Sequence, residues 1–307
     1  MNTDRRPPQA LLSEDVRLPY SKGLMARTLM GTGIRPERAY ELARLIEGVL
    51  VRGGEEHAVG AERLFNVAAS VLAEHENGDA VLLLRRLQAL RELDLPIVLL
   101  VGGATGTGKS TVATEIAHRL GITRVTSTDT VRQTMRAFFS QKFMPSIHYS
   151  SFEAGPALRI HEGEEVDAAL LGFKEQTRNV LVGVKAVIAR ALEESYSLAV
   201  EGVHLVPGAL PRSYDGAVVV QCLLVIADED EHARHFWVRE AGSEGLRPMD
   251  KYLRGLPEIR RIQEYLVERA ARAGVAVIDN ARMEAAVNDV IHLVLAEVEL
   301  LHDRAPR

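Results

Sequence analysis

The sequence predicts an α/β fold: a five-stranded parallel sheet flanked by helices, preceded by a small, mainly helical N-terminal domain. After Pro96, short apolar runs alternate with helical patterns, as in strands that are joined by helices. The first run, Ile97–Val101, is continuously apolar, as expected for a strand buried on both faces of a parallel sheet. A glycine-rich segment follows this run directly and leads into an amphipathic helix.

Periodicity and composition divide the chain into three parts. Residues 1–12 are rich in Arg and Pro and are expected to form a disordered leader. Residues 13–93 carry repeated helical spacing of apolar residues, and residues 94–307 are expected to form the α/β domain. The strands expected after the first one are Ile122–Val125, Leu198–Val200, Val218–Ile226 and Val275–Ile278.

The overall composition is that of a soluble globular protein. Of 307 residues, 47% are hydrophobic and 26% charged, and the net charge of −5 gives no reason to expect binding to nucleic acid or to an anionic membrane. Cys222 is the only cysteine, which excludes an intramolecular disulfide, and its apolar surroundings predict a core thiol. The N-terminus lacks the apolar core of a signal peptide, and no apolar run has the length of a membrane span, so we expect a cytoplasmic protein.

The glycine-rich segment matches the phosphate-binding loop G-x-x-x-x-G-K-[ST]. Glycines let backbone amides approach phosphate oxygens, and the following helix adds the partial positive charge of its N-terminus. Lys109 is expected to reach the terminal phosphates and the Ser110 hydroxyl to bind Mg²⁺. The expected nucleotide-binding residues are Gly103, Ala104, Thr105, Gly106, Thr107, Gly108, Lys109, Ser110 and Thr111.

An acidic residue, Asp129, ends the region of the second expected strand. The carboxyl ends of parallel strands face the ligand crevice, so Asp129 is a candidate base for an attacking hydroxyl. Its alternative role is to cap the following helix. Arg132 and Arg136 follow at helical spacing and suit an anionic acceptor, although a solvated basic face would give the same pattern.

A second acidic residue, Glu201, ends the third expected strand. This position suits a residue that holds Mg²⁺, together with Ser110. His204 follows closely and is a candidate substrate contact or an ordinary packed residue. Beyond the fourth strand, residues 228–254 are expected to form a mobile lid, in which Arg234 and Arg239 would stabilise the transferring phosphate unless they lie on a plain exposed helix.

The long interval at about residues 130–197 is the expected acceptor region. Its candidate acceptor contacts are Ser150, Ser151, Lys174 and Arg178. A helix that packs on the domain would explain several of these residues equally well.

Five segments taken together resemble the 2-phosphoglycerate kinase family. In order they are GGATGTGKST, STDTVRQTMR, HYSSFEA, VEGVHLVPG and HARHFWVRE, and the similarity covers roughly Pro96 to the C-terminus. The resemblance implies ATP and Mg²⁺ as cosubstrates and phosphoryl transfer to a hydroxyl of a phosphoglycerate. The segment VRLPYSKGL near the N-terminus is similar to a nucleotide-binding helical module, the ATP-cone, in which Lys22 and Arg27 would contact nucleotide; a helical domain that only packs is the alternative.

These observations predict an ATP-dependent kinase that acts on a small anionic phosphometabolite, with 2-phosphoglycerate as the first candidate. The expected catalytic residues are Lys109, Asp129, Arg234 and Arg239. The alternatives are a kinase for inositol phosphates or another phosphometabolite, and a nucleotide-binding regulatory protein without transfer activity. A homo-oligomer is compatible with the sequence.

Overall fold

The computed structural model describes residues 17–55, 58–76, 78–92, 95–158, 167–241 and 249–304. The chain divides into two compact units between Gln88 and Ala89, whereas the sequence placed this boundary after residue 93. The expected leader, residues 1–12, lies outside the described residues.

The first unit is mainly helical. Its elements are β1 (Arg17–Leu18), α1 (Lys22–Met30), α2 (Pro36–Arg52), β2 (Val59–Gly60), α3 (Ala61–His75) and most of α4 (Gly78–Glu92), whose last four residues lie beyond the boundary after Gln88. Pro36 opens α2, where its missing N–H costs no helical hydrogen bond. Leu29, Leu42 and Leu72 are fully buried and join α1, α2 and α3 in one core. The two short antiparallel strands were not expected from the helical pattern.

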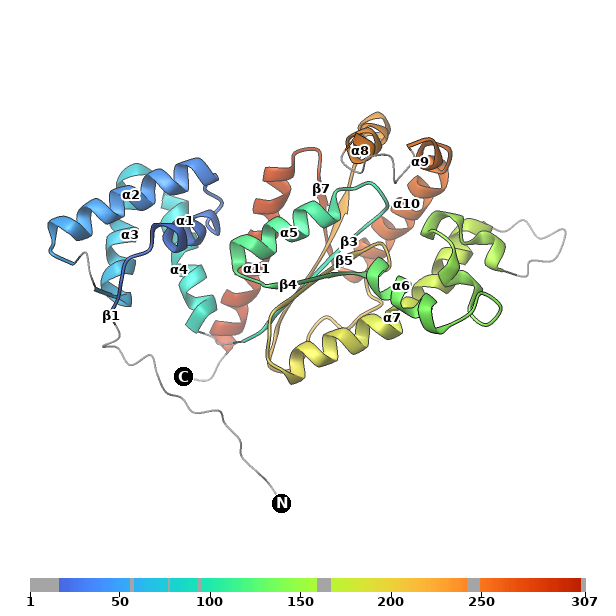
Figure 1. The fold of residues 1–307 in the computed structure, drawn as a ribbon, viewed down its shortest axis with the longest axis horizontal. Helices are drawn as coiled ribbons and strands as arrows, with labels where there is room; N and C mark the ends of the chain where they lie inside the picture. Colours follow the sequence, from blue (N-terminus) through green and yellow to red (C-terminus); the bar gives the residue numbers. More distant parts are fainter. Residues whose placement is uncertain are drawn as a thin grey trace, which may run out of the picture. The chain divides into compact units, whose positions relative to one another are not determined.

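The second unit is the expected α/β domain (Figure 1). Its strands are β3 (Ile97–Gly103), β4 (Arg124–Ser127), β5 (Leu198–Gly202), β6 (Val218–Val225) and β7 (Ala276–Asp279). Its helices are α5 (Lys109–Leu120), α6 (Thr128–Phe138), α7 (Ala168–Glu193), α8 (Glu229–Ala241), α9 (Met249–Arg254), α10 (Leu256–Ala273) and α11 (Met283–Arg304). Three short 3₁₀ turns precede α7: η1 (Pro145–His148), η2 (Ser151–Glu153) and η3 (Gly155–Ala157).

The five strands form one parallel sheet in the order β4-β5-β3-β6-β7, which confirms the predicted fold class. β5 pairs with β3, and Val101 lies opposite Glu201 in the register. This pairing brings Glu201 to the same end of the strands at which β3 leads into the phosphate-binding loop. Cys222 on β6 is buried, as expected, and burial raises the pKa of its thiol to about 12.

Two helices cover each face of the sheet. On one face, Val180 and Val184 of α7 share a buried cluster with Val98 and Leu100 of β3, and α10 packs beside α7 over β6. On the other face, α5 and α11 pack together, and the buried guanidinium of Arg119 on α5 joins them through its ion pair with Glu284 on α11. The continuous apolar character of the central strands β3, β5 and β6 follows from this double cover, whereas the outer strands β4 and β7 are partly exposed.

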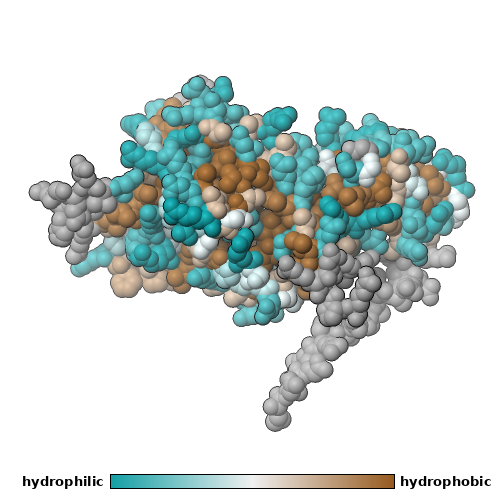
Figure 2. All heavy atoms as spheres, turned by 180° about the vertical axis from the view of Figure 1, so that it is seen from behind, coloured by the Kyte–Doolittle hydropathy of each residue, from teal (hydrophilic) through white to brown (hydrophobic). Residues whose placement is uncertain are grey.

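Hydrophilic residues cover most of the face shown in Figure 2, with hydrophobic patches between them. Exposed hydrophobic side chains are normal on globular proteins and need no special explanation when they are scattered. None of the helices in the described ranges combines the length and apolar character that crossing a membrane requires.

The close approach of α7 to the turns before it depends on Gly172. A Cβ atom at this position would collide with the backbone of Ala154 and lie 2.6 Å from the amide nitrogen of Gly155. We therefore expect Gly172→Ala to lower the free energy of unfolding by about 1–3 kcal/mol, because η2 and η3 must move away from α7.

Chemical denaturation of the whole protein measures this change. The matched control is Gly48→Ala in α2, where the new Cβ would approach only the flexible end of Arg52, at 3.7 Å. Alanine favours a helix over glycine, so the control should not be destabilised. A Gly172→Ala protein as stable as the control would contradict the close packing.

Candidate active site

The phosphate-binding loop between β3 and α5 has the backbone shape that its glycines predict. Positive φ angles occur at Gly103 (151°), Gly106 (89°) and Gly108 (78°). A Cβ at Gly108 would collide with the side-chain amide of Asn280, which donates a hydrogen bond of 3.0 Å to the Thr107 carbonyl. The loop therefore requires glycine both for its dihedral angles and for the close approach of Asn280 after β7.

Helix α8 holds the outside of the same loop. His232 Nε2 lies 2.8 Å from the Thr105 carbonyl oxygen, and His235 Nδ1 lies 3.1 Å from that of Gly106. A carbonyl oxygen only accepts, so both ring nitrogens donate. A Cβ at Gly106 would come within 2.5 Å of the Phe236 ring. These contacts hold the carbonyls of Thr105 and Gly106 on the outer side of the phosphate-binding loop. Sequence analysis assigned no role to either histidine.

Lys109, Ser110 and Glu201 meet at the mouth of the loop. The Lys109 ammonium donates to the Ala104 carbonyl at 2.6 Å, and the Ser110 hydroxyl donates to Glu201 Oε1 at 2.9 Å. A hydroxyl and a carboxylate are the hard oxygen ligands that Mg²⁺ prefers, and Mg²⁺ on nucleotides takes its remaining ligands from phosphates and water. The Ser110 hydroxyl and the Glu201 carboxylate therefore fit a nucleotide-bound Mg²⁺.

Asp129 lies in the first turn of α6, and it is not the residue that caps this helix. The side chain of Ser127 accepts the hydrogen bond from the Thr130 amide, at 2.9 Å. The Asp129 carboxylate instead accepts a hydrogen bond from Arg132 Nε at 3.1 Å, and its side chain remains 65% exposed. The capping role considered from the sequence therefore belongs to Ser127, which leaves Asp129 available to other partners.

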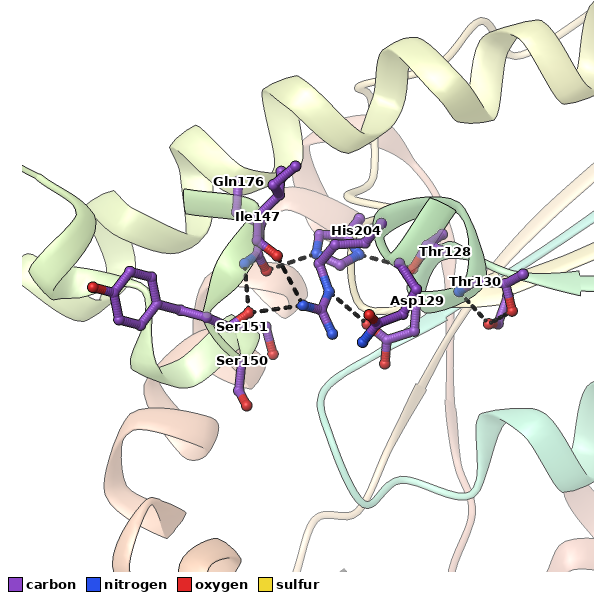
Figure 3. Close-up of polar contacts among 12 residues, drawn as sticks. Thr128, Asp129, Thr130, Ile147, Ser150, Ser151, Gln176 and His204 are labelled. Carbon is purple, nitrogen blue, oxygen red and sulfur yellow. Dashed lines mark hydrogen bonds and ion pairs between the residues drawn. The ribbon is translucent and has the colours of Figure 1, made fainter. Parts of the chain in front are cut away.

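The guanidinium of Arg132 and the amide of Gln176 fasten the segment that precedes η2. Arg132 donates from one nitrogen to the carbonyls of Ile147 and Tyr149, both at 3.0 Å. Gln176 Nε2 donates to the carbonyls of Ser146, at 2.6 Å, and Tyr149, at 3.0 Å. Figure 3 shows these contacts converging beside Asp129. Two side chains from different helices thus hold one segment of the expected acceptor region.

His204 is completely buried, and both of its ring nitrogens have partners within the protein. Gln176 Oε1 lies 2.8 Å from Nε2, and Thr128 Oγ1 lies 2.8 Å from Nδ1. Because Gln176 Oε1 only accepts, Nε2 carries a proton, and burial lowers the pKa of His204 to about 4, so the ring is neutral at pH 7 and Nδ1 accepts from the Thr128 hydroxyl. Both nitrogens are occupied within the protein, which favours the packed residue over the substrate contact among the two roles considered from the sequence.

Opposing effects set the charge of Asp129. Partial burial raises its pKa, and the positive charges of Arg132 and Lys109 lower it. The side chain is 65% exposed, so the charges outweigh burial and the pKa lies below its ordinary value. Asp129 is thus ionised at neutral pH and within the electrostatic influence of Lys109.

The expected acceptor serines lie between the phosphate-binding loop and α9. The hydroxyl of Ser151 is 3.5 Å from that of Thr105, and the Lys251 ammonium donates to Ser150 Oγ at 3.1 Å. Lys251 also pairs with Glu153 at 2.7 Å. Sequence analysis did not assign Lys251 to the site, because a lysine in a charged helix gives no signal of the distant partner that it reaches.

Arg136 and Arg234 make no hydrogen bond to this network in the described part of the chain. Arg136 is exposed and bonds to Gln133 at 3.1 Å, although it shares α6 with Arg132. Arg234 is exposed on α8, whose neighbouring histidines face the phosphate-binding loop. The side chain of Arg239 lies outside the described residues. The roles of the lid arginines remain predictions.

Lys174 and Arg178 lie on a different side of α7 from Gln176. The Lys174 ammonium is 4.6 Å from the centre of the Tyr265 ring on α10, and Arg178 pairs with Glu175 at 2.6 Å. These contacts place both cations in a groove between α7 and α10, although the sequence grouped them with the acceptor residues.

The burial of His204 predicts a specific dependence of stability on pH. Burial lowers its pKa from 6.5 to about 4 in the folded protein, so between these values the unfolded chain binds more protons. Stability is therefore complete above the unfolded pKa and falls as the pH drops from 6.5 towards 4. We expect the free energy of unfolding of His204→Gln to fall less steeply with decreasing pH than that of the wild type, by on the order of 1 kcal/mol per pH unit.

Urea unfolding of both proteins at several values between pH 7 and pH 4.5 measures the effect. Burial also lowers the pKa of His232 to about 4, so the variant should keep part of the slope. Identical slopes in the two proteins would show that His204 is protonated as easily in the folded as in the unfolded chain.

Similar solved structures are distant in sequence. A gluconokinase from Sinorhizobium meliloti is 17% identical with a TM-score of 0.36, covering 69% of this chain and 95% of that chain. A shikimate kinase from Acinetobacter baumannii in complex with shikimate is 15% identical with a TM-score of 0.37, covering 71% of this chain and 99% of that chain. Likeness at this level carries no argument about function.

Curated relatives are much closer, although no family model matches the chain. The protein named 2-phosphoglycerate kinase from Methanothermobacter thermautotrophicus is 36% identical, with 89% of each chain covered. Proteins with the same name from Pyrococcus furiosus, at 35% identity with 93% of each chain covered, and from Methanopyrus kandleri, at 33% with 93% and 86% covered, are similar over the same extent. At this identity and coverage, the chain belongs to the 2-phosphoglycerate kinase family.

Proposed function

We propose that this protein transfers the γ-phosphoryl group of ATP to the hydroxyl of 2-phosphoglycerate. The observation that carries the proposal is the register of the sheet: Glu201 of β5 lies between Val101 of β3 and Ser127 of β4, so the phosphate-binding loop and Asp129 both follow strand ends beside Glu201. The name shared by relatives of 33–36% identity supports the choice of acceptor. The cytoplasmic location expected from the sequence is part of the same proposal.

The loop between β3 and α5 would bind the triphosphate. Its amides and the N-terminus of α5 offer partial positive charge, and Lys109 adds a full charge near the terminal phosphates. Ser110 and Glu201 would hold Mg²⁺, which neutralises charge on the β and γ phosphates when it is bound. Asn280 and His232 keep the loop in this shape through its carbonyls.

Asp129 would orient the acceptor hydroxyl and take its proton. The oxygen of that hydroxyl attacks the γ phosphorus, the bond to the β–γ bridging oxygen breaks, and ADP leaves with the bonding electrons. The proton of the hydroxyl passes to the ionised carboxylate of Asp129. Lys109 stabilises the charge that spreads over the transferring group.

The anionic groups of the acceptor would bind beside positively charged side chains of the acceptor region. Arg132 shapes this region by holding the carbonyls of Ile147 and Tyr149, and Lys251 reaches it from α9 through Ser150. Arg136 is a further candidate contact for the acceptor, and Arg234 and Arg239 are candidates for closure over the bound substrates.

An acceptor panel tests the proposed function directly. ADP formation is measured with Mg²⁺ and ATP in the presence of 2-phosphoglycerate, 3-phosphoglycerate, glycerate or inositol phosphates. We expect turnover with 2-phosphoglycerate to exceed turnover with every other acceptor. Preference for an inositol phosphate would refute the proposed acceptor, and ATP hydrolysis that no acceptor stimulates would refute transfer.

Asp129→Asn tests the proton acceptor. The amide keeps the size of the side chain but cannot take a proton, so we expect kcat to fall by about 10²-fold or more while the Kd for ATP stays nearly constant. The exposed Asp215, in the connection before β6, provides the control Asp215→Asn, which should retain full activity. Equal losses of turnover and ATP binding in Asp129→Asn would remove it from this role.

Arg132→Lys tests whether the Arg132 guanidinium organises the acceptor region. Lysine keeps the charge but cannot donate to Asp129 and two carbonyls in the same plane. We expect the KM for the acceptor to rise by about tenfold or more, with a smaller change for ATP. Steady-state kinetics with Arg190→Lys, an exposed residue of α7, as the control measure the difference. An unchanged acceptor KM would contradict the account.

A further inference from the structure

A groove between α7 and α10 on one face of the sheet forms an open pocket of about 220 Å³. Three cationic side chains line it: Lys174 and Arg178 from α7, and Arg269 from α10. Tyr265 and apolar side chains from α7 and the connection after β5 form the rest of the wall. A concave site with an apolar wall and a few polar groups is the usual form of a small-ligand site.

The groove is separate from the Asp129 network. The buried ring of Phe173 stands between them, with its centre 6.2 Å from that of His204 and 6.3 Å from that of Tyr265. Lys174 and Arg178 are each two residues from Gln176, which places them about 200° around the helix from it. The same helix therefore presents Gln176 to the candidate active site and its cations to the groove.

Positive charge in the groove exceeds the nearby negative charge. Arg178 pairs with Glu175 at 2.6 Å, whereas Arg269 uses Nε on the carbonyl of Pro207, at 3.2 Å, and Lys174 lies over the Tyr265 ring. The carbonyl of Pro207 holds the Arg269 guanidinium at the wall without neutralising it. Fixed guanidinium groups of this kind recognise phosphates and carboxylates.

A buried hydroxyl in the same wall lacks a partner. Thr177 lines the groove with 6% of its surface exposed, and its Oγ1 makes no hydrogen bond with the described residues. Buried polar groups in folded proteins are nearly always hydrogen-bonded, so such an atom is available to a polar group that enters the site.

We propose that the α7–α10 groove binds a small organic or inorganic anion through Lys174, Arg178, Arg269 and Thr177, at a site separate from the acceptor and nucleotide sites. The ligand carries a phosphate or carboxylate group, and the apolar wall accommodates a short carbon skeleton. This inference goes beyond the proposed transfer reaction and does not depend on it.

Isothermal titration of the whole protein, saturated with ADP to fill the phosphate-binding loop, tests the proposal. Inorganic phosphate and succinate are titrated separately, because they distinguish recognition of phosphate from recognition of carboxylate. Arg269→Gln and Thr177→Val are compared with Arg272→Gln, which removes the same charge from an exposed position of α10. Thermal denaturation checks that each variant is folded.

We expect at least one of the two anions to bind the wild type, with affinity reduced about tenfold or more in Arg269→Gln and reduced measurably in Thr177→Val. Arg272→Gln should bind like the wild type, and the kcat of Arg269→Gln without added anion should be unchanged. Absence of binding to the wild type would overturn the proposal. Equal affinity in Arg269→Gln, Thr177→Val and the wild type would also overturn it, because the anion would then occupy another site.

Discussion

The buried guanidinium of Arg132 joins the parts of the site that come from different regions of the chain. It donates to Asp129 within α6 and to two carbonyls of the segment before η2. A guanidinium is costly to bury unless its donors are satisfied, so these acceptors must stay where they are for the charge to remain buried. Gln176 holds the same segment from α7, and His204 and Thr128 extend the network to the end of β5. The position of Asp129 is thereby set by the fold and not by α6 alone.

The phosphate-binding loop depends on the rest of the domain in a comparable way. Its glycines permit the backbone shape, but Asn280 after β7 and two histidines of α8 hold its carbonyls outwards. Because β5 lies beside β3 in the sheet, Glu201 reaches Ser110. The order of strands therefore determines which acid faces the loop. Helix α8 belongs to the expected lid region, so the loop that would hold phosphate and the segment expected to close over it are in direct contact.

Much of the fold could be predicted from the sequence because its signals are local. Apolar runs indicated four of the strands closely, the glycine pattern located the loop, and β4 (Arg124–Ser127) lies two residues beyond the expected strand Ile122–Val125. The site was harder to predict wherever a role depends on distant partners. Asp129 and Ser127 are both good helix caps by residue type, and only their geometry shows that Ser127 caps α6. His204 was considered a substrate contact, but Gln176, 28 residues away, occupies one of its nitrogens. Lys174 and Arg178 have the right charge for an acceptor site, yet their positions around α7 direct them to another groove.

The central claim is that the acceptor hydroxyl lies between the Asp129 carboxylate, which takes its proton, and the terminal phosphate of the nucleotide, which it attacks. A crystal structure of the protein with Mg²⁺, a non-hydrolysable ATP analogue and 2-phosphoglycerate measures this most directly. The account predicts that the acceptor hydroxyl lies within about 3 Å of the Asp129 carboxylate and faces the γ phosphate beside Lys109. A complex in which 2-phosphoglycerate binds elsewhere, or in which the Asp129 carboxylate points away from the acceptor, would contradict it.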